Sequence, residues 1–253
     1  MVTERLAKLF GVVRTRLKRL QDGARIYAVG DVHGHLDPLR RLHDAIGQDV
    51  LERPVAHATL LHIGDLIDRG PDSAGVLAHL AHGSPVPGTA MVNLLGNHEA
   101  MLLHALDTLD AEAAEHWAKH GGAAALSSWR VPAQAPVGDW AQHIPAAQFD
   151  VLRSLVPHWR ADDYLFVHAG IRPGTALADQ VPDDLLWIRE GFLDWPGIML
   201  PEAPDTMIVH GHTPRARPDI RVNRIGIDTG AGKGGPLSCA VLEGRHVRWL
   251  RAS

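Results

Sequence analysis

The sequence predicts an α/β protein in which a mixed-sheet β-sandwich is flanked by helices. After residue 22, short apolar runs alternate with longer helical stretches, which is the pattern of an α/β fold. Toward the end of the chain the apolar runs follow one another without helices between them, so we expect partly antiparallel pairing there. The 253 residues are 45% hydrophobic, which is enough to bury a sizeable core.

Seven strands and three helices follow from these patterns. The helices are predicted at residues 36–50, 73–82 and 99–109. The strands are predicted at residues 25–30, 59–64, 90–96, 164–168, 207–211, 224–228 and 237–242. A mixed sandwich fits this order better than a purely parallel fold does.

The stretch from about residue 110 to residue 160 differs from the rest because it contains few strand signals. Tryptophans are scattered through it among Ala, Gln and Pro, at Trp117, Trp129, Trp140 and Trp159. We expect a helical insert that forms a cap or one wall of a cleft. Alternatively, the tryptophans only anchor an irregular insert on the core. No composition shift marks a second domain, so residues 23–253 are predicted to form a single domain.

Residues 1–22 are predicted to form a basic, amphipathic helix. Residues 1–20 carry a local charge of +5, whereas the remaining 233 residues sum to −9. Apolar residues recur there at intervals of three and four, at Leu6, Leu9, Phe10, Val13, Leu17 and Leu20. Such a helix makes a weak contact with a membrane surface or a partner, or it packs on the domain with its basic face in solvent.

Composition excludes several classes of protein. The acidic body argues against nucleic-acid binding, which needs a basic face. No apolar run approaches the roughly 20 residues of a transmembrane helix. The single cysteine, Cys239, cannot form an internal disulfide. We therefore expect a cytoplasmic enzyme.

Five of the predicted strands end in a glycine-flanked turn that carries an acid, amide or imidazole. In open α/β sheets, ligands bind outside the carboxyl ends of the strands, so side chains at these ends converge on one site. Glycine permits the tight turns and close approaches that such a site needs. The five turns are Gly-Asp-Val-His-Gly (30–34), Gly-Asp (64–65), Gly-Asn-His-Glu (96–99), His-Ala-Gly (168–170) and Gly-His-Thr (211–213).

Together the turns supply carboxylate, amide and imidazole donors, which form a metal-ligand set. The six candidate ligands are Asp31, His33, Asp65, Asn97, His168 and His212. Six ligands are too many for one tetrahedral zinc, and the O/N mixture without thiolate suits Mn, Fe or Zn. Two metal ions are therefore predicted. Ions that lie about 3.5–4 Å apart need a bridging group, and Asp65 is our candidate.

These blocks, with the second extended to Gly-Asp-Leu-Ile-Asp-Arg-Gly (64–70), resemble those of the PPP-type metallophosphatases, of the calcineurin-like superfamily. The resemblance is to the bacterial and phage serine/threonine phosphatases in particular, and the blocks occur in the same order. It covers the chain from about residue 25 to residue 235. It implies the four-layer metallophosphoesterase fold.

The resemblance also implies roles for individual residues. Asp31, His33 and Asp65 would hold the first metal. The second metal would be held by Asp65, Asn97, His168 and His212. Arg69 would bind phosphate oxygens, for which a guanidinium fork is well shaped. His98 resembles the general acid of the family, with Asp68 orienting its ring.

Two later segments extend the resemblance. The segment 186–190 resembles the one that supplies a second phosphate clamp in the bacterial members, which here would be Arg189. The segment 228–232 resembles the closing block of the family, where Asp228 supports the site or only caps a turn.

The resemblance implies hydrolysis of a phosphate monoester by a metal-bridging hydroxide, without a phosphoenzyme. We expect a serine/threonine or dual-specificity protein phosphatase that uses two divalent ions, with manganese preferred to iron or zinc. The alternative is a dinucleoside-tetraphosphate hydrolase on the same metal core. A broad phosphodiesterase and a binding module without catalysis are the remaining hypotheses.

Overall fold

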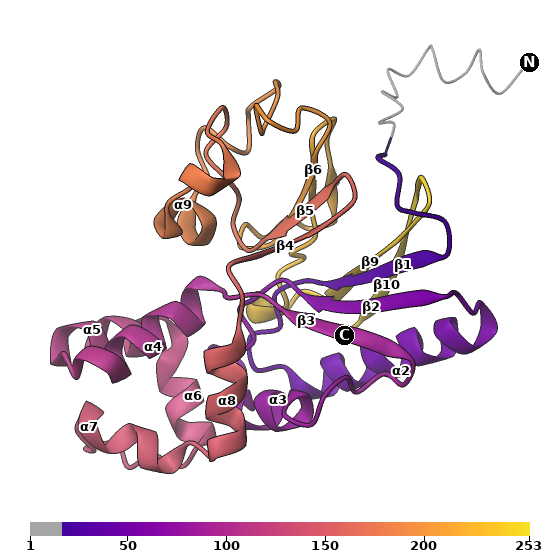
Figure 1. Ribbon diagram of the computed structural model, residues 1–253. Helices are drawn as coiled ribbons and strands as arrows, with labels where there is room; N and C mark the ends of the chain where they lie inside the picture. The colour runs from indigo at the N-terminus through magenta and orange to yellow at the C-terminus, as the bar shows by residue number, and fades with distance from the viewer. Residues whose placement is uncertain (1–16) are drawn as a thin grey trace, which may run out of the picture.

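The structure, a computed structural model, describes residues 17–253 and contains two five-stranded mixed sheets (Figure 1). The first has the order β10-β9-β1-β2-β3. Its strands are β1 (Ala24–Val29), β2 (His57–His62), β3 (Thr89–Asn93), β9 (Leu237–Glu243) and β10 (His246–Ala252). The second has the order β4-β5-β6-β8-β7. Its strands are β4 (His158–Ala161), β5 (Tyr164–Val167), β6 (Met207–His210), β7 (Asp219–Ile220) and β8 (Arg224–Gly226).

Both sheets combine a parallel centre with antiparallel edges. In the first sheet β1, β2 and β3 are parallel, while β9 runs antiparallel to β1 and β10. In the second, β5, β6 and β8 are parallel, while β4 and β7 are antiparallel edge strands. The prediction of a mixed α/β sandwich is therefore confirmed.

The helices lie mainly in two groups. In Figure 1, α2 and α3 run along one face of the first sheet, and α4 to α8 lie together at one end of it. They are α2 (Leu36–Glu52), α3 (Ser73–Leu80), α4 (Asn97–Thr108), α5 (Ala111–Trp117), α6 (Ala123–Ser128), α7 (Val137–Trp140), α8 (Ala146–Ser154) and α9 (Pro182–Trp187). Short helical turns occupy Ala118–Gly122, Ala141–His143, Leu177–Asp179 and Ala231–Lys233. None of the helices in the range 17–253 has both the length and the apolarity that a membrane crossing requires.

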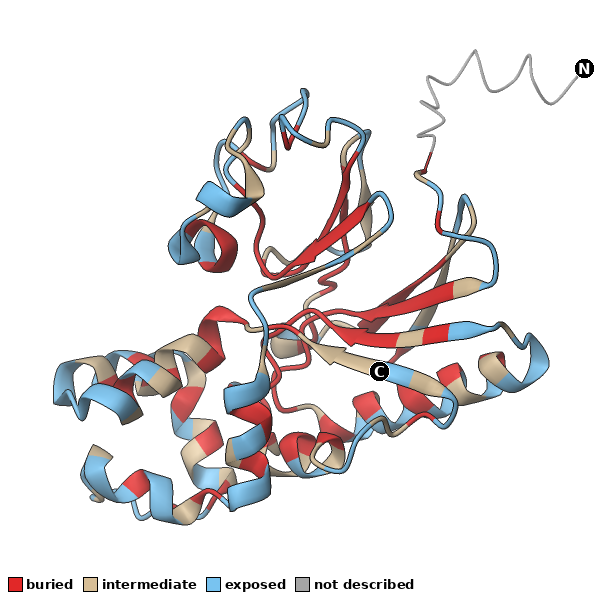
Figure 2. Cartoon of the chain, viewed as in Figure 1, coloured by how far each residue is buried: buried red, intermediate tan, exposed pale blue. Residues whose placement is uncertain are grey.

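Three clusters of buried side chains hold these layers together. Between the sheets, Leu61 and Ile63 of the first pack with Phe166 and Val209 of the second. On the other face of the first sheet, strand residues pack against α2 and α3. On the outer face of the second sheet, strand residues pack against α9 and the loops around it. Figure 2 shows this burial in the central strands and along one side of α2. Each fully buried aliphatic side chain contributes about 1.5–3 kcal/mol to stability.

The structure adds three strands that the sequence patterns did not reveal. β4, β7 and β10 are all edge strands, and β4 and β10 carry charged or polar residues that face solvent, such as Arg160 and Arg251. An edge strand is covered on one side only, so its sequence lacks the continuous apolar run of a central strand.

The predicted N-terminal helix falls mostly on residues 1–16, which lie outside the described residues. Its end, residues 17–22, is not helical. Leu17 and Leu20 are buried in the cluster between the sheets, and the Leu20 N–H donates to the Gly244 carbonyl. The apolar spacing of Leu17 and Leu20 therefore reflects the packing of a non-helical segment into the cluster between the sheets.

Candidate active site

The five predicted blocks lie at the carboxyl ends of β1, β2, β3, β5 and β6. Because these strands are parallel within each sheet and the sheets face one another, their end loops meet at one place. All six predicted metal ligands are buried there: Asp31, His33, Asp65, Asn97, His168 and His212.

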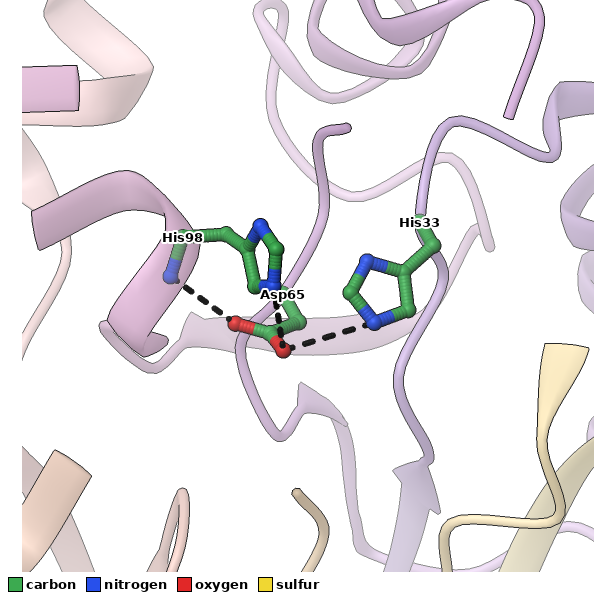
Figure 3. Close-up of side chains that lie close together, drawn as sticks. All are labelled: His33, Asp65 and His98. Carbon is green, nitrogen blue, oxygen red and sulfur yellow. Dashed lines mark hydrogen bonds and ion pairs between the residues drawn. The ribbon is translucent and has the colours of Figure 1, made fainter. Parts of the chain in front are cut away.

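Asp65 lies at the centre of this cluster. One of its oxygens, Oδ2, is 3.4 Å from His33 Nε2 and 4.0 Å from His98 Nε2 (Figure 3). The other, Oδ1, is 3.4 Å from His168 Nε2. Burial favours the neutral acid, but the charges of the surrounding imidazoles, His168 first, outweigh it and hold the pKa of Asp65 well below its usual range. Asp65 is thus an anion that faces imidazoles on two sides.

Two groups of ligand atoms share this carboxylate. The donors of His33, Asp65 and His98 lie within 4.8 Å of one another, and so do those of Asp65, His168 and His212. The amide oxygen of Asn97 is 2.9 Å from His168 Nε2 and 3.0 Å from His212 Nδ1. Within residues 17–253, the buried His212 Nε2 has no hydrogen-bond partner.

Asp31 lies next to these groups, and its ligand atoms belong to neither. Both of its oxygens accept from the His212 backbone N–H, at 3.2 and 3.0 Å. Burial, together with the charges of Asp228 and Asp65, raises the pKa of Asp31 well above its usual value. Burial also raises the pKa of Asp228 to about 6. Three buried carboxyl groups close together, beside an unpartnered imidazole nitrogen, fit a site for bound cations.

His98 and Asp68 form a second arrangement beside the predicted metal ligands. His98 Nδ1 is 2.6 Å from Asp68 Oδ2, and the same oxygen accepts from Trp117 Nε1 at 2.7 Å. Burial lowers the pKa of His98, but the charge of Asp65 and the hydrogen bond and charge of Asp68 outweigh it, so the pKa is raised. Protonation of His98 is therefore easier than that of an ordinary histidine.

Arg69 spans the same region from the loop after β2. Its two terminal nitrogens donate to His33 Nε2 at 2.7 Å and to His98 Nε2 at 2.9 Å. The guanidinium fork thus lies over the cluster, and its side chain is exposed toward solvent. A phosphate bound at this position would meet a planar bidentate donor.

Arg189 follows α9 and is exposed. Burial first, then the charge of His168, lower the pKa of His212 to about 3, and the charge of Arg189 adds to this effect. Arg189 is therefore close enough to the cluster for its charge to act there. The aromatic ring of Trp187 stands edge-on to His212, with ring centroids 5.9 Å apart.

The loops that carry the cluster are conformationally unusual. Five non-glycine residues of the site have a positive φ, which costs energy unless surrounding contacts enforce it. They are His33, Asp65, Asp68, Arg69 and His212. The loops also approach one another closely, since a Cβ added to Gly96 would lie 2.2 Å from the Asp65 nitrogen.

Glu99 and Trp117 are two site residues whose roles the sequence patterns did not reveal. The buried Glu99 side chain accepts hydrogen bonds from four backbone N–H groups, those of Asp65, Leu66, Ile67 and Gly96, at 2.7–3.0 Å. It joins the loop after β2 to the start of α4. The position of Glu99 in the Gly-Asn-His-Glu block could have indicated that it belongs to the site. Nothing in the sequence distinguishes Trp117 from the other tryptophans of its region.

His210 is a further candidate ligand by its position, because it lies two residues before His212. Its ring packs on Phe192 with centroids 5.0 Å apart, and its Nε2 is 3.3 Å from Arg224. It is not a member of either ligand group. His210 therefore packs against Phe192 and Arg224 next to the site and does not belong to the ligand cluster.

The chain is similar to several known phosphoesterases. The family described as calcineurin-like phosphoesterase matches residues 24–238. The chain is 30% identical over 237 residues to serine/threonine-protein phosphatase 1 of Salmonella typhimurium, a match that covers 86% of this chain and 92% of that protein. It is 28% identical over 241 residues to an asymmetrical bis(5'-nucleosyl)-tetraphosphatase of Halalkalibacterium halodurans, with 83% of this chain and 87% of that protein covered.

A solved structure shares the fold. The crystal structure of a cold-active protein-tyrosine phosphatase of a psychrophilic Shewanella superposes with a TM-score of 0.56 at 18% sequence identity. The superposition covers 93% of this chain and 83% of that chain.

Proposed function

Because the chain belongs to the calcineurin-like phosphoesterase family, we propose that it hydrolyses phosphoserine and phosphothreonine esters in proteins. The observation that carries this proposal is the His98–Asp68 pair beside the metal ligands. A serine or threonine alkoxide is a poor leaving group, so its departure needs a proton from a general acid. A nucleotide leaving group departs as a stabilised anion and needs this proton much less.

The residues present fit two divalent ions. Asp31, His33 and Asp65 would hold one ion, and Asp65, Asn97, His168 and His212 the other, with His98 next to the first. When bound, the ions supply Lewis acidity toward the phosphate and lower the pKa of a coordinated water. The O/N donor set without thiolate favours manganese, iron or zinc, and manganese is our proposal.

The remaining steps fall to side chains of this chain. Arg69 and Arg189 bind the equatorial phosphate oxygens and orient the ester for in-line displacement. When Arg69 turns from His98 to the phosphate, the His98 Nε2 is free to carry a proton. Asp68, through Nδ1, holds the ring in place while His98 gives that proton to the leaving oxygen.

The leaving group tests this proposal. The His98→Asn variant, loaded with manganese, is expected to lose about 10²–10⁴-fold in turnover of a phosphoserine peptide. It should lose far less on p-nitrophenyl phosphate, whose leaving group needs no proton. His104→Asn, an exposed histidine on the same helix α4, is the control and should behave as the wild type does. Equal losses on both substrates would exclude His98 as the general acid.

Hydrolysis of bis(5'-nucleosyl) tetraphosphates is the second candidate function. It is favoured by the similarity to the Halalkalibacterium halodurans enzyme. Diadenosine tetraphosphate and phosphoserine, phosphothreonine and phosphotyrosine peptides should be assayed side by side. Cleavage of the dinucleotide without peptide turnover would move the function to nucleotides and leave the metal ligands unchanged.

A further inference from the structure

Asp68 and Arg69 are neighbours that both adopt the left-handed backbone conformation, with φ of 74° and 65°. For residues with a Cβ this conformation costs energy, so contacts from other parts of the chain must hold it. One such contact is local, because the Asp68 N–H donates to Ser73 Oγ at 2.9 Å. The others come from the helical region that follows α4.

The first of these contacts is made by the helical turn Ala118–Gly122. The Gly121 carbonyl accepts a hydrogen bond from the Arg69 backbone N–H at 3.1 Å. Gly121 has a φ of 119°, and a Cβ added to it would lie 2.7 Å from Arg69 Cγ. Both its backbone conformation and its closeness to Arg69 therefore require glycine. The turn fixes the backbone from which the phosphate-binding guanidinium extends.

The second contact is made by Trp117, at the end of α5. Its side chain is fully buried, and its Nε1 donates to Asp68 Oδ2 at 2.7 Å. This is the oxygen that also binds His98 Nδ1, while Asp68 Oδ1 has no hydrogen-bond partner within residues 17–253. Burial raises the pKa of Asp68, and the hydrogen bonds from His98 and Trp117 act in the opposite direction. Trp117 thus fixes the side-chain rotamer of Asp68 and supports its charge.

The turn and the tryptophan form one unit. A Cβ at Gly122 would lie 2.4 Å from the Trp117 ring, so the backbone of the turn packs directly on the indole. We propose that residues 117–122 position the reaction groups, with Trp117 holding Asp68 against His98 and Gly121 seating Arg69. The roles of His98 and Arg69 rest on the function proposed above. Trp117 is a positioning residue, since it acts through Asp68 and does not itself reach the metal ligands.

Two tryptophans of this region provide a matched test. Trp117→Phe removes the N–H donor to Asp68 and keeps an aromatic ring. Trp140→Phe is the control, because Trp140 is buried, packs 5.5 Å from the Trp117 ring and donates only to the Ala135 carbonyl. We would measure steady-state kinetics at saturating manganese, on a phosphoserine peptide and on p-nitrophenyl phosphate. We would also measure the pH profile of kcat.

We expect Trp117→Phe to lower kcat on the peptide about 10²-fold, with KM nearly unchanged and a much smaller loss on p-nitrophenyl phosphate. The limb of the pH profile that reports the general acid should also shift. Trp140→Phe should leave kcat and the pH profile as in the wild type. Equal kinetics for the two variants would overturn the proposal.

If Trp117→Phe does not fold, 3-benzothienylalanine at position 117 keeps the shape of the indole and lacks the N–H, and the same outcomes apply. The substrate preference of the wild type tests the proposed function separately from this inference. A wild type that cleaves only diadenosine tetraphosphate contradicts the proposed function. Since a nucleotide leaving group needs little help from His98, the positioning role is then decided through Arg69. Gly121→Ala, whose Cβ would lie 2.7 Å from Arg69 Cγ, should lower kcat on that substrate, whereas Gly138→Ala, with no atom within 4 Å of its Cβ, should not; equal kinetics for these two variants would overturn the proposal.

Discussion

We expect acid to destabilise this protein through a chain of three histidines between α2, β2 and α3, of which His43 and His62 are buried. His62 Nδ1 is 2.7 Å from the Asn93 side-chain oxygen, which can only accept, so this nitrogen carries the proton. His62 Nε2 must then accept from His43 Nε2, 3.0 Å away. His43 Nδ1 in turn accepts from His79 Nε2, also at 3.0 Å. His62 and His43 each accept at one ring nitrogen, so this pattern holds only while both of these rings are neutral, whereas His79 only donates.

Burial is the main reason why these rings resist protonation. It lowers the pKa of His43 to about 2, with help from the charges of His62 and His79, and the pKa of His62 to about 4. In the unfolded chain both rings titrate near 6.5. The unfolded state therefore binds more protons below this pH, and stability falls as the pH falls from about 6.5 toward 4. At pH 5 each ring lowers the free energy of unfolding by about 2 kcal/mol, so the two rings together lower it by about 4 kcal/mol.

The double variant His43→Leu/His62→Leu isolates this contribution. Urea unfolding at pH 7.5 and pH 5.0 should show that the wild type loses about 4 kcal/mol more than the double variant over this interval. Buried site histidines such as His33 and His212 also resist protonation, but they contribute equally to both proteins. His82→Gln, which changes an exposed histidine, should follow the wild type. If the double variant loses as much stability as the wild type, the reasoning is wrong.

Two further substitutions test the site. Asp65→Asn removes the charge that both ligand groups share, so calorimetric titration should show that manganese binding is lost or greatly weakened. Asp150→Asn changes an exposed carboxylate and should bind manganese as the wild type does. Unchanged binding by Asp65→Asn would contradict a bridging role. Gly96→Ala places a Cβ 2.2 Å from the Asp65 nitrogen, so it should lower the unfolding free energy by about 1–3 kcal/mol in urea unfolding. Gly138→Ala is the control, because a Cβ there meets no atom within 4 Å, and it should unfold as the wild type does. Similar urea midpoints for the two variants would refute the close approach at Gly96.

The sequence predicted the central parts of the fold for a clear physical reason. Strands such as β1, β2 and β5 are buried on both faces, so their apolar runs stand out and the glycine turns after them mark where they end. The edge strands β4, β7 and β10 have no such run. The predicted helix was wrong at its end, residues 17–22. Leu17 and Leu20 are three residues apart, as on one face of a helix, but they are buried between the sheets by a segment that is not helical.

The sequence by itself determined which residues are candidates for the chemistry, because the predicted metal ligands and Arg69 occur in short blocks at strand ends. Asp31, Asp65 and Asn97 each stand in such a block, directly after a glycine that follows an apolar run. Only the tertiary structure decided how these groups are held. Trp117 lies 49 residues from Asp68 in the chain, and their hydrogen bond depends on how two separate segments pack. The same is true of the histidine chain, because no local pattern records which buried polar groups meet across elements.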